Sequence, residues 1–241
     1  METHPSQKTL AASMMLLFIA VAAHGAPRHN QNAASAPDAR TASASSPQTA
    51  QPPADLGSVS GNLYTNDSLG MAYEFPKGWF VDRAWIEAQN KPVDSGPRPT
   101  DPDEAAKYDS MVAMKQGTHA LLAVSERGGD TASDSGPRIQ LSVSPVFDNK
   151  TGGDILTGMK SVYGHMRLIQ IEDDPADVTF GGQIFSRMDM RLLDVILRGG
   201  AGFQSAIIGV RNGRYLQFLI LANSQEQLDS LVHSLDSLRF K

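Results

Sequence analysis

The clearest pattern along the chain is a pair of apolar segments joined at Asn212-Gly213. Asn-Gly supplies the two positive φ angles of a type I′ turn, so the sequence predicts a β-hairpin over residues 203–222 with Ile207 opposite Phe218. In this register one face is apolar and the other is mixed but still mainly apolar. We therefore expect a central pair of strands with helices packed on it.

Strands are also predicted near the start of the folded region. Residues 62–65 read as a short strand and 66–70 as a turn, after which 71–75 alternate between apolar and polar positions. Pro76-Lys77-Gly78-Trp79 should end that strand, because proline has no N–H to donate and glycine permits positive φ. Further strands are predicted over residues 119–126, 138–146, 167–171 and 183–193, and 193–197 either extends the last one or bends it.

Helical signals occur in three places. Thr100 or Asp101 can cap a helix that ends near Ser110, and apolar residues recur at helical spacing from 154 to about 164. Ser224 and Gln227 fit a capping box for a third helix that ends near residue 234 or 235. The last residues, 238–240, then form a short strand or a docked tail.

The N-terminal 25 residues have the order of a secretory signal peptide: a charged Lys8, an apolar run over 10–23, then small residues. Cleavage fits after Ala23 or after Gly25. Residues 26–58 are rich in Ala, Ser, Pro and Gln, so we expect a disordered tether followed by a single domain over 59–241. The protein should be exported, periplasmic or extracellular; the alternative is retention by an uncleaved N-terminal anchor.

Composition narrows the classes of function. The chain has no cysteine, which excludes a lipid-modified cysteine, thiolate metal sites and a cysteine nucleophile. Its 21 basic and 26 acidic residues give a net charge of −5, and the basic residues are scattered. Nucleic acid is therefore not expected as a partner, because its binding needs a concentrated basic surface.

No motif predicts a catalytic, cofactor or metal site. His119, His165 and His233 lack metal-ligand spacing, and no Gly-x-Ser-x-Gly elbow is present. The acidic run from Glu172 to Asp177 could hold a hard cation such as calcium, but it lacks the alternating ligands and central glycine of a calcium loop. A solvated loop is the simpler interpretation.

Trp79, Trp85 and Ile86 are the candidate site residues, because they could line an apolar groove for a peptide, lipid or partner protein. The alternative interpretation is that they belong to the ordinary core.

The two ends of the domain resemble the Mog1/PsbP-like family of α/β sandwiches. The resemblance rests on Tyr64-Thr65-Asn66, on residues 69–79 with their Pro-x-x-Trp corner, and on Ser234-Leu235-Asp236-Ser237-Leu238-Arg239-Phe240. It does not extend to residues 83–116. The family resemblance implies an α+β fold with an antiparallel sheet of about six strands flanked by helices, in which Phe75 and Trp79 fill the core and Pro76 and Gly78 turn the chain.

The family's members mostly act as binding or assembly subunits of larger complexes, including roles at a photosystem and on a small GTPase, and they offer no catalytic set to transfer. We therefore expect a noncatalytic binding or assembly module of the bacterial cell envelope, with a protein partner and no stable membrane insertion after signal cleavage. A carrier of a small apolar ligand and a hydrolase with an unrecognised site are the alternatives.

Overall fold

The computed structural model describes residues 55–92, 96–126, 136–146, 149–197 and 200–241. The predicted signal peptide, the tether up to residue 54 and most of the residues between the strands predicted over 119–126 and 138–146 lie outside these ranges. Asp55 to Ser58, which the sequence assigned to the tether, already belong to the fold. The side chain of Asn66 donates to the carbonyl of Asp55 at 2.7 Å, and the Tyr64 hydroxyl donates to that of Leu56 at 3.0 Å.

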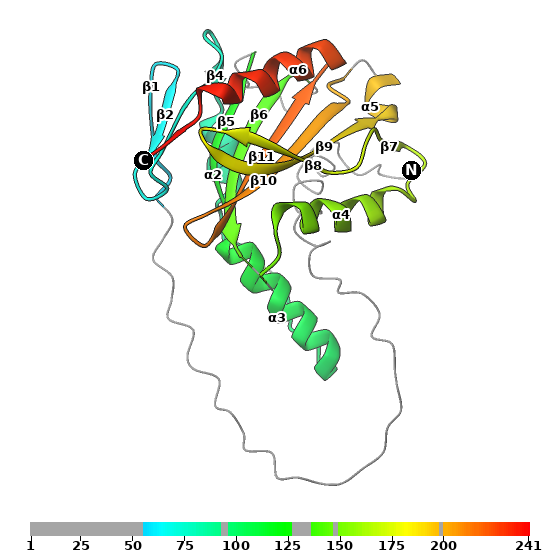
Figure 1. Cartoon of the computed structure of the whole chain (residues 1–241). Coiled ribbons are helices and arrows are strands. Elements are labelled where there is room, and N and C mark those ends of the chain that lie inside the picture. Colours follow the sequence, from blue (N-terminus) through cyan, green and yellow to red (C-terminus); the bar gives the residue numbers. More distant parts are fainter. Residues whose placement is uncertain (1–54, 93–95, 127–135, 147–148, 198–199) are drawn as a thin grey trace, which may run out of the picture.

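An antiparallel sheet of eight strands forms the centre of the molecule (Figure 1). The fold is therefore α+β, as expected, with a larger sheet than the six strands predicted. Its spatial order is β4 (Phe80–Val81), β5 (His119–Ser125), β6 (Arg138–Pro145), β11 (Arg214–Ala222), β10 (Phe203–Arg211), β9 (Gln183–Leu192) and β7 (Ile169–Ile171), and β8 (Ala176–Phe180) also pairs with β9.

The central hairpin has the predicted register. Ile207 lies opposite Phe218, and the turn residues Asn212 and Gly213 have φ angles of 49° and 71°. Two positive φ angles in a row are those of the type I′ turn, so the local sequence is sufficient to set this pairing.

A second sheet of four strands packs beside the first. Its order is β1 (Ser58–Ser60), β2 (Leu63–Asn66), β3 (Met71–Glu74) and β12 (Arg239–Phe240). Of the two alternatives predicted for the C-terminal residues, a short strand or a docked tail, the structure has the strand, which pairs with β3. Met71, Tyr73 and Phe75 are all buried, which confirms the predicted inward face of the 71–75 segment.

Helices cover both faces of the large sheet. On one face lie α6 (Gln225–His233) and the short 3₁₀ helix η2 (Ser234–Ser237), over a core that includes Ile207, Phe218 and Leu231. On the other lies α4 (Gly152–Tyr163), packed on Ile208 and Tyr215 among others. The mixed face of the hairpin is therefore covered in part by a helix, as its apolar residues predicted, while Val210 near the turn stays exposed. None of the helices in the described ranges is both long and apolar enough to cross a bilayer.

Strands β1 and β4 and the short helix α2 (Arg83–Gln89) were not predicted from the sequence, and the structure differs from the prediction in four further elements. The first predicted helix is longer: α3 (Pro102–Gly117) continues seven residues past Ser110. Strand β8 replaces part of the predicted acidic loop, and residues 193–197 form the short helix α5 (Leu193–Leu197). At α6, the Gln227 side chain accepts from the backbone N–H of Asn223 rather than from Ser224, so the capping box is incomplete.

Candidate functional site

Between the short helix α2 (Arg83–Gln89) and β5, the chain leaves the body of the domain in a projection that we call the helical arm, residues 96–118. Figure 1 shows its helix α3 running away from both sheets, with the N-terminal end farthest from them. Asp101 caps α3 by accepting from the backbone N–H groups of Asp103 and Glu104, both at 3.0 Å. Acidic residues in the first turn favour this helix end electrostatically.

The arm is braced by its own polar contacts. Arg98 and Asp109 form a two-pronged ion pair, with Nε to Oδ1 at 2.9 Å and a terminal nitrogen to Oδ2 at 2.7 Å. The Tyr108 hydroxyl donates to the carbonyl of Gly96 at 2.7 Å. The hydrogen bond from Arg98 lowers the pKa of Asp109, so the pair stays charged at neutral pH. These contacts hold the segment before α3 against the side of the helix.

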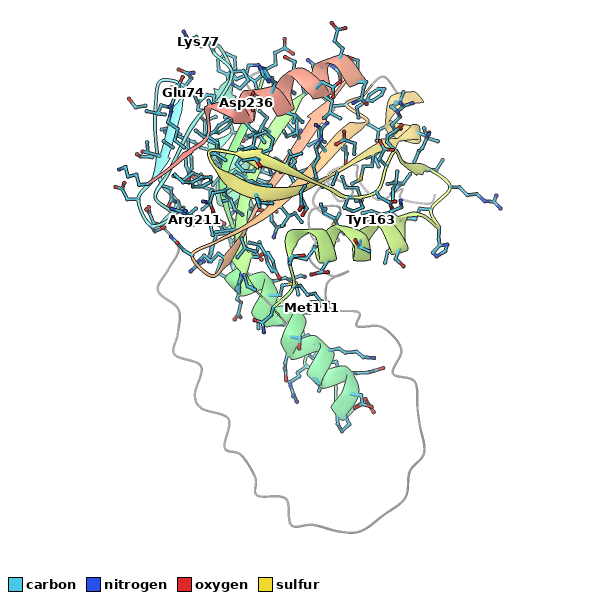
Figure 2. The ribbon with its side chains drawn as sticks, viewed as in Figure 1. Glu74, Lys77, Met111, Tyr163, Arg211 and Asp236 are labelled. Carbon is cyan, nitrogen blue, oxygen red and sulfur yellow. The ribbon has the colours of Figure 1, made fainter. Side chains whose placement is uncertain are left out.

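Most of α3 is open to solvent. Of its 16 residues only Ala105 and Met114 are buried, and Met111 is 36% exposed. Figure 2 labels Met111 on the part of the helix that has already left the sheets. Helices in proteins gain most of their stability from packing an apolar face, and α3 packs little of its surface.

The base of the arm, in contrast, is fixed tightly. Asn90 donates through Nδ2 to the carbonyl of Ala120 at 2.8 Å, and the Ala120 N–H donates back to Oδ1 at 2.9 Å. Gly117 passes so close to Pro145 that a Cβ at this position would lie 2.4 Å from the proline ring. The two ends of the arm are therefore joined to each other and to the sheet.

The predicted site residues are divided between two environments, Trp79 next to β4 at the Ser125 end of β5, and Trp85 and Ile86 on α2. Trp79 follows the turn at Gly78, whose φ is 82°, and packs partly buried against the main core. Trp85 and Ile86 are half-buried on α2, which contacts β5, and in the described part of the chain neither belongs to a core cluster. All three side chains are half-buried, and a groove formed by them stays a prediction.

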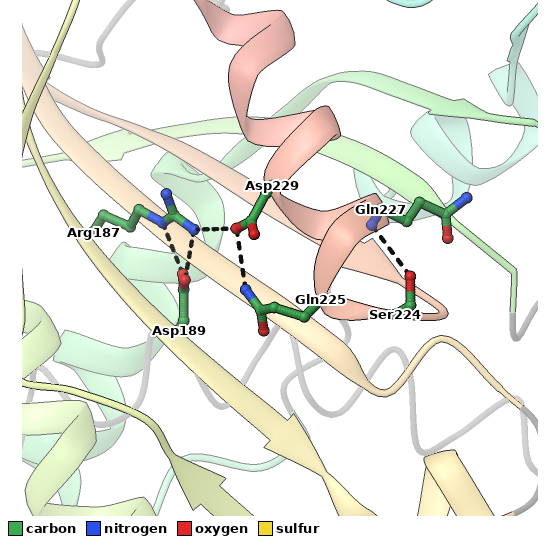
Figure 3. A network of polar contacts seen from close by, with 6 residues as sticks. All are labelled: Arg187, Asp189, Ser224, Gln225, Gln227 and Asp229. Atoms are coloured by element: carbon green, nitrogen blue, oxygen red, sulfur yellow. Dashed lines mark hydrogen bonds and ion pairs between the residues drawn. The ribbon is translucent and has the colours of Figure 1, made fainter.

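A charged network joins α6 to the large sheet on the opposite side (Figure 3). Arg187 binds Asp189 through two contacts of 2.8 and 2.5 Å and approaches Asp229 of α6 at 3.5 Å. Burial lowers the pKa of Arg187, but its hydrogen bond with Asp189 and the nearby carboxylates outweigh that effect and raise the pKa overall. Arg187 and Asp189 compensate each other's charge, so the network is suited to holding α6 in place.

The acidic run does not form one cluster. Glu172 pairs with Arg191 at 2.7 Å, Asp174 with Lys160 at 2.5 Å, and Asp177 accepts from the Ser186 hydroxyl at 3.0 Å. Within the described ranges, no group of three His, Asp or Glu side chains is placed to hold a metal ion.

The arm could be predicted only in part. Residues 111–115 are mostly good helix formers, and Gly117 is a residue type that commonly ends a helix. A helix that continues past Ser110 could therefore have been predicted from the sequence. The direction in which that helix projects could not be predicted from the sequence, because it depends on the hydrogen bonds between Asn90 and Ala120.

Comparison with known proteins gives matches in structure alone. No family model matches the chain, and no curated protein matches its sequence. The structure is similar to that of cyanobacterial PsbP (CyanoP) from Synechocystis sp. PCC 6803, with 15% identity, a TM-score of 0.41, and coverage of 77% of this chain and 99% of that one.

It is also similar to LpqN, involved in cell envelope biogenesis of Mycobacterium tuberculosis, with 12% identity, a TM-score of 0.37, and coverage of 71% of this chain and 83% of that one. Over most of its length the chain is thus structurally similar to two proteins of the Mog1/PsbP-like fold.

Proposed function

We propose that this protein is a noncatalytic binding or assembly module of the cell envelope, and that its helical arm is the element that contacts a partner protein. Export is part of the proposal through the predicted signal peptide. The observation that carries the proposal is the burial pattern of α3, with two buried residues in a helix of 16.

A fixed projecting helix is well suited to binding. Its conformation is already ordered by the Arg98–Asp109 pair, the Asp101 cap and the contacts at Asn90. Less conformational entropy is therefore lost when a partner docks than would be lost by a flexible loop. Partners commonly bind such a helix in an apolar groove through a few anchor residues, and Met111 is the exposed large apolar residue on α3.

The test compares two charge substitutions in the full chain. An affinity-tagged protein is recovered from the envelope fraction of its own organism, and the protein retained in stoichiometric amount is identified by mass spectrometry. We expect Met111→Asp to lose this protein, because a carboxylate at the anchor cannot enter an apolar groove. Ile184→Asp is the matched control, since Ile184 is exposed on β9, and it should retain the partner.

A second variant removes the arm. Because Asn90 and Ala120 are joined by hydrogen bonds, residues 92–117 can be replaced by a short Gly-Ser linker that spans the base. The expected result is a folded domain by circular dichroism that no longer retains the partner. Retention of the same partner by the armless chain, or a retained small molecule with no protein, would overturn the proposal.

A further inference from the structure

Strand β8 forms an open edge of the large sheet. Within the ranges that the structure describes, it pairs with β9 and with no other strand. Ala176, Asp177 and Thr179 of this strand are exposed, and Val178 is half-buried. Strand β1, at the edge of the small sheet, has three residues against five in β8. An open strand edge of this length can bind another extended segment through its backbone groups.

The hairpin turn determines which backbone groups of β8 point outward. Its two residues, Gly181 and Gly182, both have positive φ, as in a type I′ turn, so the residues on either side of them form a hydrogen-bonded pair. Bonded and non-bonded pairs alternate along an antiparallel ladder. Val178 therefore bonds to β9, whereas the N–H and C=O groups of Asp177 and Thr179 point to the open side. Among the described residues these four groups have no hydrogen-bond partner.

The side chains of Asp177 and Thr179 limit what can bind to this edge. Asp177 accepts from the Ser186 hydroxyl through Oδ1 at 3.0 Å, and its other carboxylate oxygen is exposed. Thr179 lies two residues along on the same face and carries an exposed hydroxyl. A charged side chain at a sheet edge opposes the addition of an arbitrary strand. A strand that binds here must therefore offer a donor or a positive charge to Asp177.

We propose that β8 pairs with β8 of a second copy of this chain, in an antiparallel arrangement about a two-fold axis at Val178. In this register Asp177 of each copy lies opposite Thr179 of the other, so the outward backbone groups form four N–H···O=C bonds. Each Thr179 hydroxyl can donate to the carboxylate that it faces, and the two Val178 side chains meet at the axis. This inference does not depend on the proposed function.

The edge thus offers a second copy what it requires of a partner. The two Asp177 carboxylates lie only on the diagonal of the new ladder, about 7–8 Å apart between Cα atoms, and both stay in contact with water. Because a pair of five-residue strands buries little surface, we expect a weak dimer whose population depends on concentration.

The experiment is sedimentation equilibrium of the full chain at concentrations up to about 0.5 mM. We expect a reversible equilibrium between monomer and dimer. Thr179→Asp places like charges opposite each other at two positions of the interface, and it should weaken dimerisation at least about tenfold. Thr179→Lys places an ammonium group opposite each carboxylate, and it should strengthen dimerisation about threefold at low salt and less at high salt.

Ser230→Asp and Ser230→Lys are the controls, because they add the same charges at an exposed position of α6 and should leave the equilibrium unchanged. Circular dichroism verifies that all four variants are folded. A wild-type chain that stays monomeric at every concentration would overturn the inference. Equal dimerisation of the Thr179→Asp and Thr179→Lys chains would also overturn it, because the contact between the copies would then lie elsewhere.

Discussion

At the scale of single residues, Asn90 shows how one amide side chain can close a structure. Its donor and acceptor take the places of a peptide group and pair with the N–H and carbonyl of Ala120 at the edge of β5. An amide side chain is well matched to this role, because it carries both functions in one plane.

Replacing Asn90 with Ala should lower the free energy of unfolding by about 1–3 kcal/mol, because it leaves a partly buried donor and acceptor without a partner. Urea denaturation followed by circular dichroism measures the change. Glu87→Ala on the exposed side of α2 is the control and should stay within about 0.5 kcal/mol. Equal stability of the two variants would mean that the base of the arm is held by other contacts.

Asp154 supplies a prediction about pH. It accepts from the N–H and hydroxyl of Thr151 at 2.8 and 2.7 Å, and these hydrogen bonds lower its pKa below the ordinary value of 3.8. A carboxylate with a lowered pKa stabilises the fold above its unfolded pKa, and this contribution is lost as pH falls through the folded value. The stability difference between wild type and Asp154→Asn should therefore be constant near neutral pH and shrink below about pH 4; a difference independent of pH would contradict this account of the cap.

At the scale of elements, α6 illustrates a helix whose position depends on one apolar face. Leu228, Leu231 and Val232 are buried against the sheet, whereas Ser230 points to solvent. Figure 3 shows the polar side of the same helix, where Asp229 meets Arg187.

Leu231→Ala should destabilise the domain by about 2–5 kcal/mol, since it removes buried methyl groups and leaves a cavity. Thermal and urea unfolding both report this loss. Ser230→Ala, one position away, should change the free energy of unfolding by no more than about 0.5 kcal/mol. A small effect at Leu231 would show that α6 is peripheral to the core.

The elements that could be predicted are those determined by neighbouring residues. Asn212-Gly213 sets the central hairpin, and the alternation of residues 71–75 sets the inward face of β3. Strand β8 was missed because its outward residues are polar and the acidic run before it favours a solvated loop, although β8 pairs with β9 across the Gly181-Gly182 turn. At the candidate site, the half-buried positions of Trp85 and Ile86 likewise depend on where α2 meets β5.

At the scale of the whole molecule, Arg211 joins the two sheets. From the end of β10 its guanidinium donates to the carbonyls of Leu69 at 3.3 Å and Lys241 at 2.6 Å, and lies 4.9 Å from the centre of the Phe240 ring. Figure 2 labels Arg211 at this junction. The pairing of a strand near the start of the fold with one at its end could not be predicted from local patterns, because it is fixed by contacts of this kind.

Arg211→Ala should destabilise the fold by about 1–2 kcal/mol, less than for a fully buried residue because Arg211 is partly exposed. Arg211→Lys should recover only part of the loss, since lysine keeps the charge but not the planar two-pronged geometry. Chemical denaturation of both variants measures this, with exposed Arg239→Ala as the control. Identical unfolding of Arg211→Ala and wild type would show that the sheets associate without this contact.

The cover that α2 and Asn90 place along β5 also bears on how concentrated solutions of this protein behave. An open sheet edge offers a row of free N–H and C=O groups to any other extended chain. Here the backbone N–H of Asp82 donates to the carbonyl of Ala123 at 2.9 Å, and the side chain of Asn90 donates to the carbonyl of Ala120. These groups of the edge are therefore already bonded to residues of the same chain. If α2 unwinds, two molecules can pair edge to edge, and aggregation would then begin at β5 while the hydrophobic core is still intact.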